Sequence, residues 1–455
     1  MIKNLLSFLF AFSSFIAFSQ DKKLFENYQF RVNNFKAVDM FLGTSANSSN
    51  NYRAYGANKI LGGGTGANIV AIKSTDKIYR TIEANLLGNF YFITNNTTIN
   101  TNKSRQLYFS PNVNINNKWY SANHFFELGT NLSFENKAEN TKTPDGVVSN
   151  TKFSDNNADV NFTIGVGRGR LEIVTDLQNA LWLAKILHDE KNISRKLTDD
   201  EINELAKTIT QSIYFRVLDG RRRIQYVLKK VDAYLQSKNV IGKTDINYFT
   251  NLNDVVLFAN NFFRQEGELK YLRLIPRVRN NRISNEQVGA VRNKSLNNYF
   301  ANEISLRLGF EKYKPLNLYR QVDYGFAANA GYGENKLSNK NYVNDTIFSE
   351  VKNNPIGKRI GLDYFVRYNL YPNTRTVISF SLDAQNGYLL YYGERSIYSG
   401  VNLSAGANYF INYNTRFVLN IQENYFQNIY QSNNYLRNNE YALILAFNAG
   451  LNISL

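Results

Sequence analysis

Long segments of the chain alternate apolar and polar residues in steps of two, which is the pattern of a β-strand with one apolar face. In the C-terminal segment 440–455, Tyr441, Leu443, Leu445 and Phe447 share one face, and small or polar residues occupy the other. Strands of soluble proteins are usually only about five or six residues long. Since a lipid bilayer admits only helices and closed barrels, these long segments predict a transmembrane β-barrel.

The connections between the segments indicate how the strands are arranged. A short connection such as Asn117-Lys118 falls at every second position, and longer ones such as 136–154 and 335–356 lie between them. Outer-membrane barrels have short periplasmic turns and longer surface loops. We therefore predict an all-β transmembrane barrel of about 12 antiparallel strands, with both ends of the mature chain in the periplasm. The predicted strands are 78–94, 104–116, 119–135, 155–172, 268–283, 296–312, 318–334, 357–371, 374–391, 398–413, 415–429 and 440–455.

The alternation breaks off in mid-chain and gives way to a helical period. From Thr175 onward apolar residues such as Leu177 and Leu181 recur every three or four positions. Thr175 is predicted to cap the first helix, and Thr198 with Glu201 has the pattern of a capping box at a second helix. Because four strands precede this region, parity predicts that it lies in the periplasm. We predict barrel strands 1–4 in 78–172, a helical periplasmic insertion in 173–267 and barrel strands 5–12 in 268–455.

The first residues have the pattern of an export signal. A positive residue precedes the apolar run 5–18, and Ala17 and Ser19 place small residues at −3 and −1 of a cleavage site. We therefore expect residues 1–19 to be a signal peptide. Residues 20–77 are predicted to form an N-terminal arm or plug, because a thirteenth strand at 66–74 would put the two chain ends on opposite sides.

The junction between the two patterns resembles a known group of proteins. The export signal, the Tyr- and Asn-rich strands and the stretch GRGRLEIVTDLQNAL (167–181) are similar to outer-membrane β-barrel proteins of the Bacteroidota. In those proteins a Gly-Arg strand end leads into a helical insertion. The resemblance is carried mainly by residues 160–235. It implies an outer-membrane location, but it brings no catalytic or binding residues with it.

The composition excludes several kinds of chemistry. Without Cys the chain has no disulfide, no thiolate nucleophile and no Cys-ligated metal. Its two His, His124 and His188, are too few for a zinc site made of several His. The formal charge of +16 comes from scattered Lys and Arg, which favours solubility over nucleic-acid binding. We expect no metal, no cofactor, no nucleic-acid partner and no enzymatic activity, with outer-membrane lipid around the barrel.

Two glycine-rich stretches lack the residues that would make them nucleotide-binding loops. GVGRGR (165–170) has Arg where the dinucleotide fingerprint needs its third Gly, and GGGTG (62–66) is not followed by Lys-Ser or Lys-Thr. We interpret both as backbone devices that leave room between strands or let a strand bend.

The polar face of the predicted strands carries charges of both signs in nearly equal number. Such charges tend to pair and to fill a narrow lumen. They are Glu83, Glu127, Arg273, Arg277, Glu303, Arg307, Asp323, Arg359, Asp363, Arg367, Arg375 and Asp383.

Two functions of different classes are compatible with these patterns. In the first, a non-enzymatic barrel has a structural or assembly role, and its insertion docks an envelope protein in the periplasm. Arg221, Arg222 and Arg223 form the densest basic run and are the candidate contact, although a solvated helix face with Asp219 paired at helical spacing is the simpler interpretation. In the second, the barrel is a narrow channel for small polar solutes that is gated by the insertion.

Overall fold

The structure is a computed structural model of the chain. The residues that it describes are 21–51, 56–96, 101–142, 150–213, 220–258, 263–289, 291–391, 394–412, 415–432 and 435–453. The predicted signal peptide at 1–19 lies outside these residues.

One antiparallel sheet contains all fifteen strands of the described residues. Neighbours in the sheet follow chain order from β1 to β9 and from β11 to β15, and β10 lies off this path because it pairs only with β9. The bounds are β1 Val32–Asn51, β2 Gly56–Ser74, β3 Ile78–Asn96, β4 Thr101–Ser121, β5 His124–Lys142, β6 Asn150–Ile173, β7 Gln265–Val288, β8 Arg292–Asn317, β9 Arg320–Val343, β10 Thr346–Asn353, β11 Ile356–Asn373, β12 Thr376–Tyr391, β13 Glu394–Asn412, β14 Thr415–Ser432 and β15 Tyr435–Ile453.

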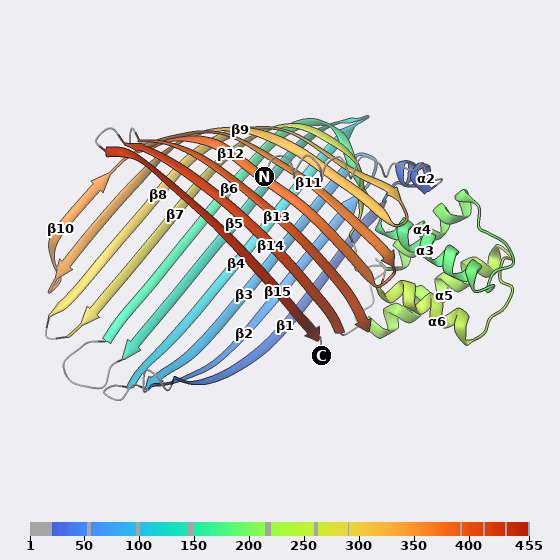
Figure 1. Ribbon diagram of the computed structural model, residues 1–455, viewed down its shortest axis with the longest axis horizontal. Coiled ribbons are helices and arrows are strands. Elements are labelled where there is room, and N and C mark those ends of the chain that lie inside the picture. The colour runs from blue at the N-terminus through green and yellow to red at the C-terminus, as the bar shows by residue number, and fades with distance from the viewer. Residues whose placement is uncertain are drawn as a thin grey trace.

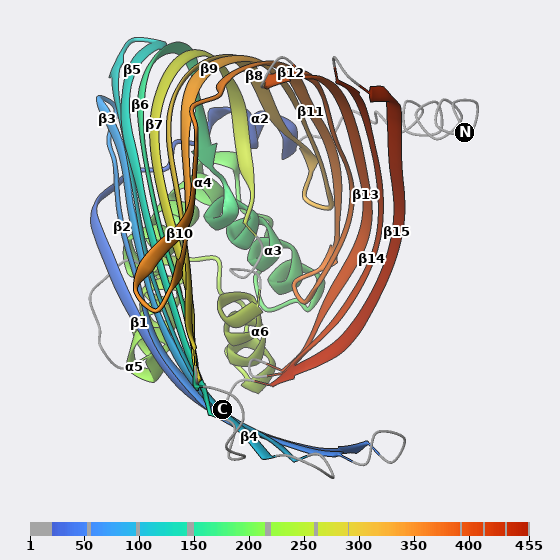
Figure 2. The ribbon, with the colours of Figure 1, turned by 90° about the vertical axis from the view of Figure 1, so that its left-hand side faces the viewer.

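The sheet has the shape of a barrel. Figure 2 shows that it curls through most of a ring, with β1 and β15 at its two ends. Within the described ranges the strand order ends at β1 on one side and at β15 on the other. The predicted class, an all-β barrel with a helical insertion, is confirmed.

The helices gather at one end of this barrel (Figure 1). We call this the helical end, and the opposite end the loop end. The four helices between β6 and β7 form the helical domain, and a short helix precedes β1. The bounds are α2 Asp21–Asn27, α3 Thr175–Asp189, α4 Asp199–Ile213, α5 Gly220–Ser237 and α6 Ile246–Phe258.

The parity of the connections agrees with the sequence pattern. β1 begins and β15 finishes at the helical end, and between them the turns β2–β3, β4–β5, β8–β9 and β11–β12 lie at this same end. Each of these turns spans two or three residues. The helical domain occupies the place of one such turn, as the position of the segment 173–267 predicts.

The predicted number of strands and the role of residues 20–77 are wrong. This segment forms α2 and the two wall strands β1 and β2, so the path in the sheet has fourteen strands rather than twelve. Because two extra strands keep the number of wall strands even, the start of β1 and the end of β15 still lie at the same end of the barrel. The sequence hides β2 because GGGTG supplies no alternating side chains, and β1 because its second half is a run of small and polar residues.

One predicted turn lies in the wrong place. The connection predicted at Asn117-Lys118 belongs to β4, and the chain turns instead at Ala122 and Asn123, where Ala122 has a φ of 52°. The strand continues through Lys118 because this residue pairs with Glu127 of β5 in register. Lys118 therefore marks an inward-facing strand position here and not a turn, while Asn117 shares the outer face with its register partner Leu128.

The outer face of the barrel is apolar and exposed. Leu308 of β8, Phe326 of β9 and Ile360 of β11 have 56%, 55% and 64% of their surface exposed. The residues on either side of them in each strand point inward, since side chains alternate between the faces of a sheet. An exposed apolar surface of this extent marks a region that contacts lipid or another protein.

The helical domain has a core like that of a soluble protein. Leu177 and Leu183 of α3, Leu205 of α4, Leu235 of α5 and Leu252 of α6 are fully buried together. No helix within the described ranges combines the length and the apolar character that crossing a membrane requires.

The helix starts were predicted with mixed success. The capping box of α4 is present, because the Thr198 backbone N–H donates to Glu201 Oε2 at 2.8 Å and the Glu201 N–H donates to Thr198 Oγ1 at 3.3 Å. At α3 the N-cap is Val174 and not Thr175. The hydroxyl of Thr175 instead accepts a hydrogen bond from the backbone N–H of Arg264, which joins the first helix to the start of β7.

Candidate functional site: the lumen and its capped end

The inner face of the sheet carries eleven of the twelve predicted lumen charges. Their positions follow from the register, which aligns Glu127 with Gly165, Gly165 with Arg273 and Arg273 with Arg307 across four strands. Most of these charges lie in ion pairs that join different strands. Below we call the space that the inner face surrounds the lumen.

The most buried ion pair reaches across an intervening strand. Arg273 Nε of β7 donates to Glu127 Oε2 of β5 at 2.8 Å, and the carboxylate also accepts from Asn116 Nδ2 at 2.7 Å. The strand between them, β6, has Gly165 at this position, and a Cβ there would lie only 3.2 Å from Glu127 Oε2. The first glycine of GVGRGR therefore makes room for the ion pair.

A second ion pair uses the same arrangement. Arg359 of β11 lies 2.6 Å from Glu303 of β8, and β9 runs between their strands. Gly331 of β9 is the residue that they pass, since a Cβ at Gly331 would lie 2.8 Å from Arg359 Nε and 2.9 Å from Glu303 Oε1. In both of these pairs, glycine on the intervening strand leaves room for the two charged side chains to meet.

Further pairs line the wall, and one acid among them was missed. Arg307 lies 3.4 Å from Asp363, and Arg367 lies 3.3 Å from Asp383. Arg277 and Arg279 both pair with Asp159 of β6, which the sequence analysis did not single out. Asp159 follows the inward parity of β6, so a stricter count along that strand finds it.

Three of the predicted lumen charges are placed differently. Glu83 is exposed on the inner face of β3, with no ion pair among the described residues. Asp323 is buried and accepts a hydrogen bond from Gln321 Nε2 at 2.7 Å. The prediction for Arg375 is wrong, because it lies in the β11–β12 turn at the helical end, where its side chain pairs with Asp254 of α6.

A cavity of about 530 Å³ opens on the inner wall between β7 and β14. Its lining combines charged groups, amides and aromatic rings. Tyr271 and Phe365 lie flat across glycines of neighbouring strands, since a Cβ at Gly309 would lie 2.3 Å from the Tyr271 ring and one at Gly325 would lie 2.7 Å from the Phe365 ring. The two rings therefore occupy the room that the glycines leave on the wall, and Tyr271 is in turn covered by the guanidinium of Arg273.

The helical domain lies across the opening of the barrel at the helical end. Figure 2, which looks along the barrel from the loop end, shows α3 and α6 within the outline of the ring, and Figure 1 shows them beyond the strand ends. At one contact, Trp182 of α3 packs edge-on against Tyr319 of the β8–β9 turn, with ring centroids 5.3 Å apart. Leu318 of that turn belongs to the core of the helical domain.

Arg264 holds this junction together. Its buried guanidinium donates to Gln321 Oε1 at 2.9 Å and to the carbonyl of Leu318 at 3.0 Å. Its plane lies 4.7 Å from the ring of Phe25 in α2 and 4.7 Å from the ring of Tyr371 in β11. Arg264 also donates to the carbonyls of Asn317 and Arg320. One side chain thus joins α2, the β8–β9 turn and β11 to the end of the helical domain.

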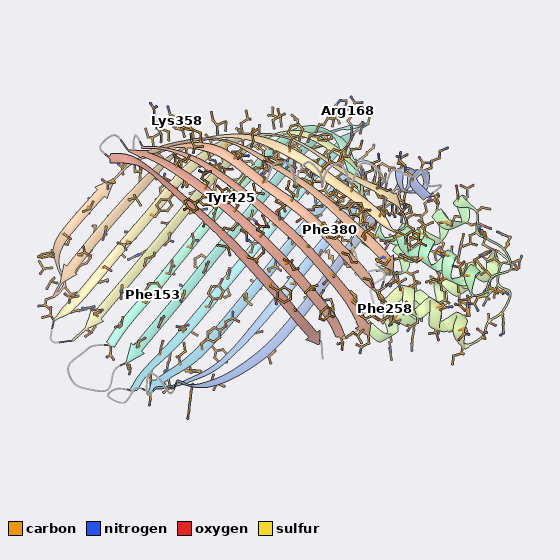
Figure 3. All side chains as sticks on the ribbon, viewed as in Figure 1. Phe153, Arg168, Phe258, Lys358, Phe380 and Tyr425 are labelled. Carbon is orange, nitrogen blue, oxygen red and sulfur yellow. The ribbon has the colours of Figure 1, made fainter. Side chains whose placement is uncertain are left out.

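A second contact fixes α6 to the strand ends. Asp254 accepts from Arg375 Nε at 2.9 Å and from Thr374 Oγ1 at 2.8 Å. Phe258, at the end of α6, packs against Phe410 with ring centroids 6.1 Å apart, and Figure 3 shows it where the helices meet the strands. We call Asp254, Phe258, Thr374, Arg375 and Phe410 the α6 contact.

The remaining glycine-arginine residues of β6 tie the first strand to the barrel. Arg170 and Arg31 both pair with Glu172 at 2.9 Å. Gly169 has a φ of 95°, and a Cβ there would meet the carbonyl oxygen of Glu268 at 2.1 Å. Gly169 therefore lets β6 pass close to the backbone of β7, and β6 stays paired with β7 as far as Ile173, just before α3.

The helical domain contains one buried acid with a shifted pKa. Asp176, in the first turn of α3, accepts a hydrogen bond from Thr210 Oγ1 of α4 at 2.5 Å. Burial raises the pKa of its carboxyl group to about 6, and the bond from Thr210 opposes this shift. The Thr210 hydroxyl also lies 3.0 Å from the hydroxyl of Tyr28, just after α2.

The other residues singled out from the sequence form no site. His124 starts β5 at the helical end, and His188 lies in the last turn of α3, so the two histidines belong to different elements of the fold. Within the described ranges no three His, Cys, Asp or Glu side chains are placed to hold a metal ion. Arg222 is exposed at the start of α5, and the side chains of Arg221 and Arg223 lie outside the described residues, as does Asp219.

No family model matches the sequence, and no curated protein is similar to it. Three solved structures show a distant similarity. The translocator domain of the autotransporter NalP from Neisseria meningitidis has 8% identity and a TM-score of 0.29, covering 84% of this chain and 90% of that one. The β-domain of the Bordetella autotransporter BrkA has 9% identity and a TM-score of 0.27, covering 78% and 92%.

The third is the ferric yersiniabactin uptake receptor FyuA from Yersinia pestis, with 5% identity and a TM-score of 0.28, covering 93% of this chain and 73% of that one. Scores of this size do not group the chain with any of the three. The barrel fold therefore rests on the hydrogen-bonded strand order of the chain itself.

Proposed function

We propose that the protein is a non-enzymatic pore of the bacterial outer membrane for small polar solutes, with the helical domain on the periplasmic side closing the lumen. The apolar outer face supports the membrane location, because exposed residues such as Leu308 and Ile360 are stable only where lipid replaces water. The even number of wall strands supports a periplasmic helical domain, since outer-membrane barrels carry both chain ends there.

The observation that carries this proposal is the position of the helical domain across one opening. A domain whose only role is to dock a partner has no need to cover the lumen. Here α3 and α6 cross the opening, and the α6 contact fixes α6 to the β11–β12 turn. The lumen behind them contains paired charges and a cavity instead of a continuous apolar core. This favours a gated channel over the structural role.

Conductance in planar bilayers tests the pore. We expect the purified full-length protein to be closed most of the time, with brief openings. Arg375→Ala removes the partner of Asp254 in the α6 contact, so the open fraction should rise several-fold. Arg195→Ala is the matched control, because Arg195 pairs with Glu201 within the helical domain and away from the strands. Absence of current from both the unchanged protein and Arg375→Ala would contradict the pore.

Thiol labelling tests the orientation. The chain has no Cys, so a single introduced Cys reports its own position. On intact cells an impermeant maleimide should label Phe348→Cys, which lies exposed in β10 at the loop end, and should leave Lys229→Cys in α5 unlabelled. Labelling of Lys229→Cys alone would mean that the barrel is inserted the other way round.

A docking role remains the second candidate because of α5. This helix packs against α4 and α6, and it exposes Arg222, Lys229 and Lys230. A basic helix face on the periplasmic side suits an acidic partner protein. Cross-linking from a photoreactive residue at Lys229 in cells tests it, and a single discrete adduct is expected. If only lipid or no adduct forms, α5 is a solvated face.

A further inference from the structure

The cavity on the inner wall contains hydrogen-bonding atoms that nothing in the protein satisfies. Two of the residues that line it have a buried side-chain atom without a hydrogen-bond partner, Arg307 Nε on β8 and the amide oxygen of Asn402 on β13. The first is a donor and the second an acceptor. An unsatisfied buried polar atom is costly, so a molecule that both donates and accepts hydrogen bonds is favoured in this cavity.

The charges at the cavity argue against an ionic ligand. Arg307 pairs with Asp363, and Arg367 pairs with Asp383, so two cations balance two carboxylates. The further acid, Glu311, accepts a hydrogen bond from the Tyr271 hydroxyl at 3.0 Å, and its charge also acts on Lys118. A free ion of either sign would add an uncompensated charge to this balanced set. A neutral molecule does not.

The carboxylates have unused acceptor capacity. An ionised carboxylate has about four acceptor positions. Asp363 uses them for Arg307 and for Asn329 Nδ2, which donates at 3.3 Å. Asp363 and Asp383 are each about two fifths exposed toward the lumen, so their remaining positions are accessible to hydroxyl donors.

Aromatic rings complete the lining. Phe365 lies against Gly325 of the neighbouring strand and is half-buried at the cavity, whereas Tyr271 lies against Gly309, is buried and is covered by the guanidinium of Arg273. Small-molecule sites usually combine such apolar surface with a few convergent polar groups, in cavities of about 300–1,000 Å³. The volume of about 530 Å³ lies within this range.

We propose that this cavity binds a small neutral polyhydroxylated solute, a mono- or disaccharide. Its ring hydroxyls accept from the exposed part of the Arg307 guanidinium, contact Asn402 and donate to Asp363 and Asp383, and its C–H face packs on Phe365. The interpretation of this cavity as a binding site along the path of a transported solute rests on the proposed pore function. Binding itself is measurable without any current, so the two ideas can fail separately.

Calorimetric titration of the full-length protein in detergent tests the site. Maltose is the neutral probe, choline the cationic probe and acetate the anionic one. We expect maltose to bind with millimolar affinity, and choline and acetate to give no heat of binding. Arg307→Gln should weaken maltose binding at least tenfold, and so should Asn402→Ala. The matched control is Arg277→Gln, because Arg277 also faces the lumen and pairs with an aspartate, but lies outside the cavity lining.

The outcomes separate the hypotheses. Choline or acetate binding in place of maltose would overturn the neutral-solute assignment, as would equal losses in Arg307→Gln and Arg277→Gln. Maltose binding with no bilayer current would support the binding site and overturn the proposed pore function. A bilayer current that maltose does not block, together with no heat of maltose binding, would support the pore and overturn the binding site. Unchanged far-UV circular dichroism in each variant shows that lost binding does not come from misfolding.

Discussion

The helical domain and the barrel differ in which residues they bury and which they expose. Leu177 and Leu183 in α3 are fully buried, whereas Leu308 and Ile360 in the sheet are more than half exposed. Charges show the reverse, because Glu127 of the sheet is buried against Arg273 on the inner face and Lys229 of α5 is exposed. The two regions of one chain are thus built for two different surroundings, water for the helices and lipid for the sheet.

The largest expected difference between the two regions is in their contact with lipid. The chain has two Trp, one in each region. Trp119 lies on β4 beside Phe126 of the exposed outer face, whereas Trp182 is buried in α3. In bilayers of lipids with brominated acyl chains, the fluorescence of Trp119 in the Trp182→Phe variant should be strongly quenched. Trp182 in the Trp119→Phe variant should keep nearly all of its intensity.

Quenching by aqueous acrylamide in the same vesicles is the complementary measurement. Both tryptophans should be protected from it, Trp119 by lipid and Trp182 by the core of the helical domain. Equal bromine quenching of the two residues would refute the division into a lipid-facing region and a water-facing region.

The second effect concerns the junction between the regions. Arg264→Ala removes four hydrogen bonds, one of them to the Leu318 carbonyl, and the packing of the guanidinium between Phe25 and Tyr371. A hydrogen bond to a charged group contributes about 1.5–3 kcal/mol, so the helical domain should lose at least ~3 kcal/mol of its attachment. Hydrogen exchange should then speed up in α3 and α6 while the strands β5 to β9 stay protected.

Arg195→Ala is the control for this variant, since its side chain is exposed and pairs within the helical domain. It should leave exchange in α6 unchanged. If Arg264→Ala instead accelerates exchange in the sheet and the helices alike, the two regions unfold as one unit. That result would contradict the division into two separately stabilised regions.

The smallest effect is a pH dependence confined to the helical domain. Burial raises the pKa of Asp176 to about 6 from its ordinary value of 3.8, so folding favours the neutral acid. Its contribution to stability is fully present below about pH 4 and is lost as the pH rises through about 6. One pKa unit corresponds to about 1.4 kcal/mol, which sets the loss at no more than roughly 3 kcal/mol.

Asp176→Asn keeps an acceptor for Thr210 and cannot ionise. The variant should therefore remove the pH dependence and stabilise the helical domain at pH 7. Urea unfolding followed by Trp182 fluorescence at pH 4.5 and pH 7.5 measures this. A variant that is equally pH-dependent would show that another group causes the change.

Much of the architecture could be predicted from the sequence because its causes are local. Twelve of the wall strands follow from alternation, which lipid on one face and a polar lumen on the other impose on every second residue. The helices follow from the change of period after Thr175, and the start of α4 from Thr198 and Glu201. Two strands were missed where glycines and small polar residues replace the alternating side chains of β2 and β1.

The sequence by itself determined which faces are apolar, where the chain turns helical and which residues point into the lumen. Tertiary structure alone decided which charges meet. Glu127 and Arg273 pair because the register places Gly165 between them, and Arg375 leaves the lumen for Asp254 because the helical domain folds back over that turn. Alternation fixes the direction of a side chain, but its partner lies on another strand, and only the register and the closure of the sheet bring the two together.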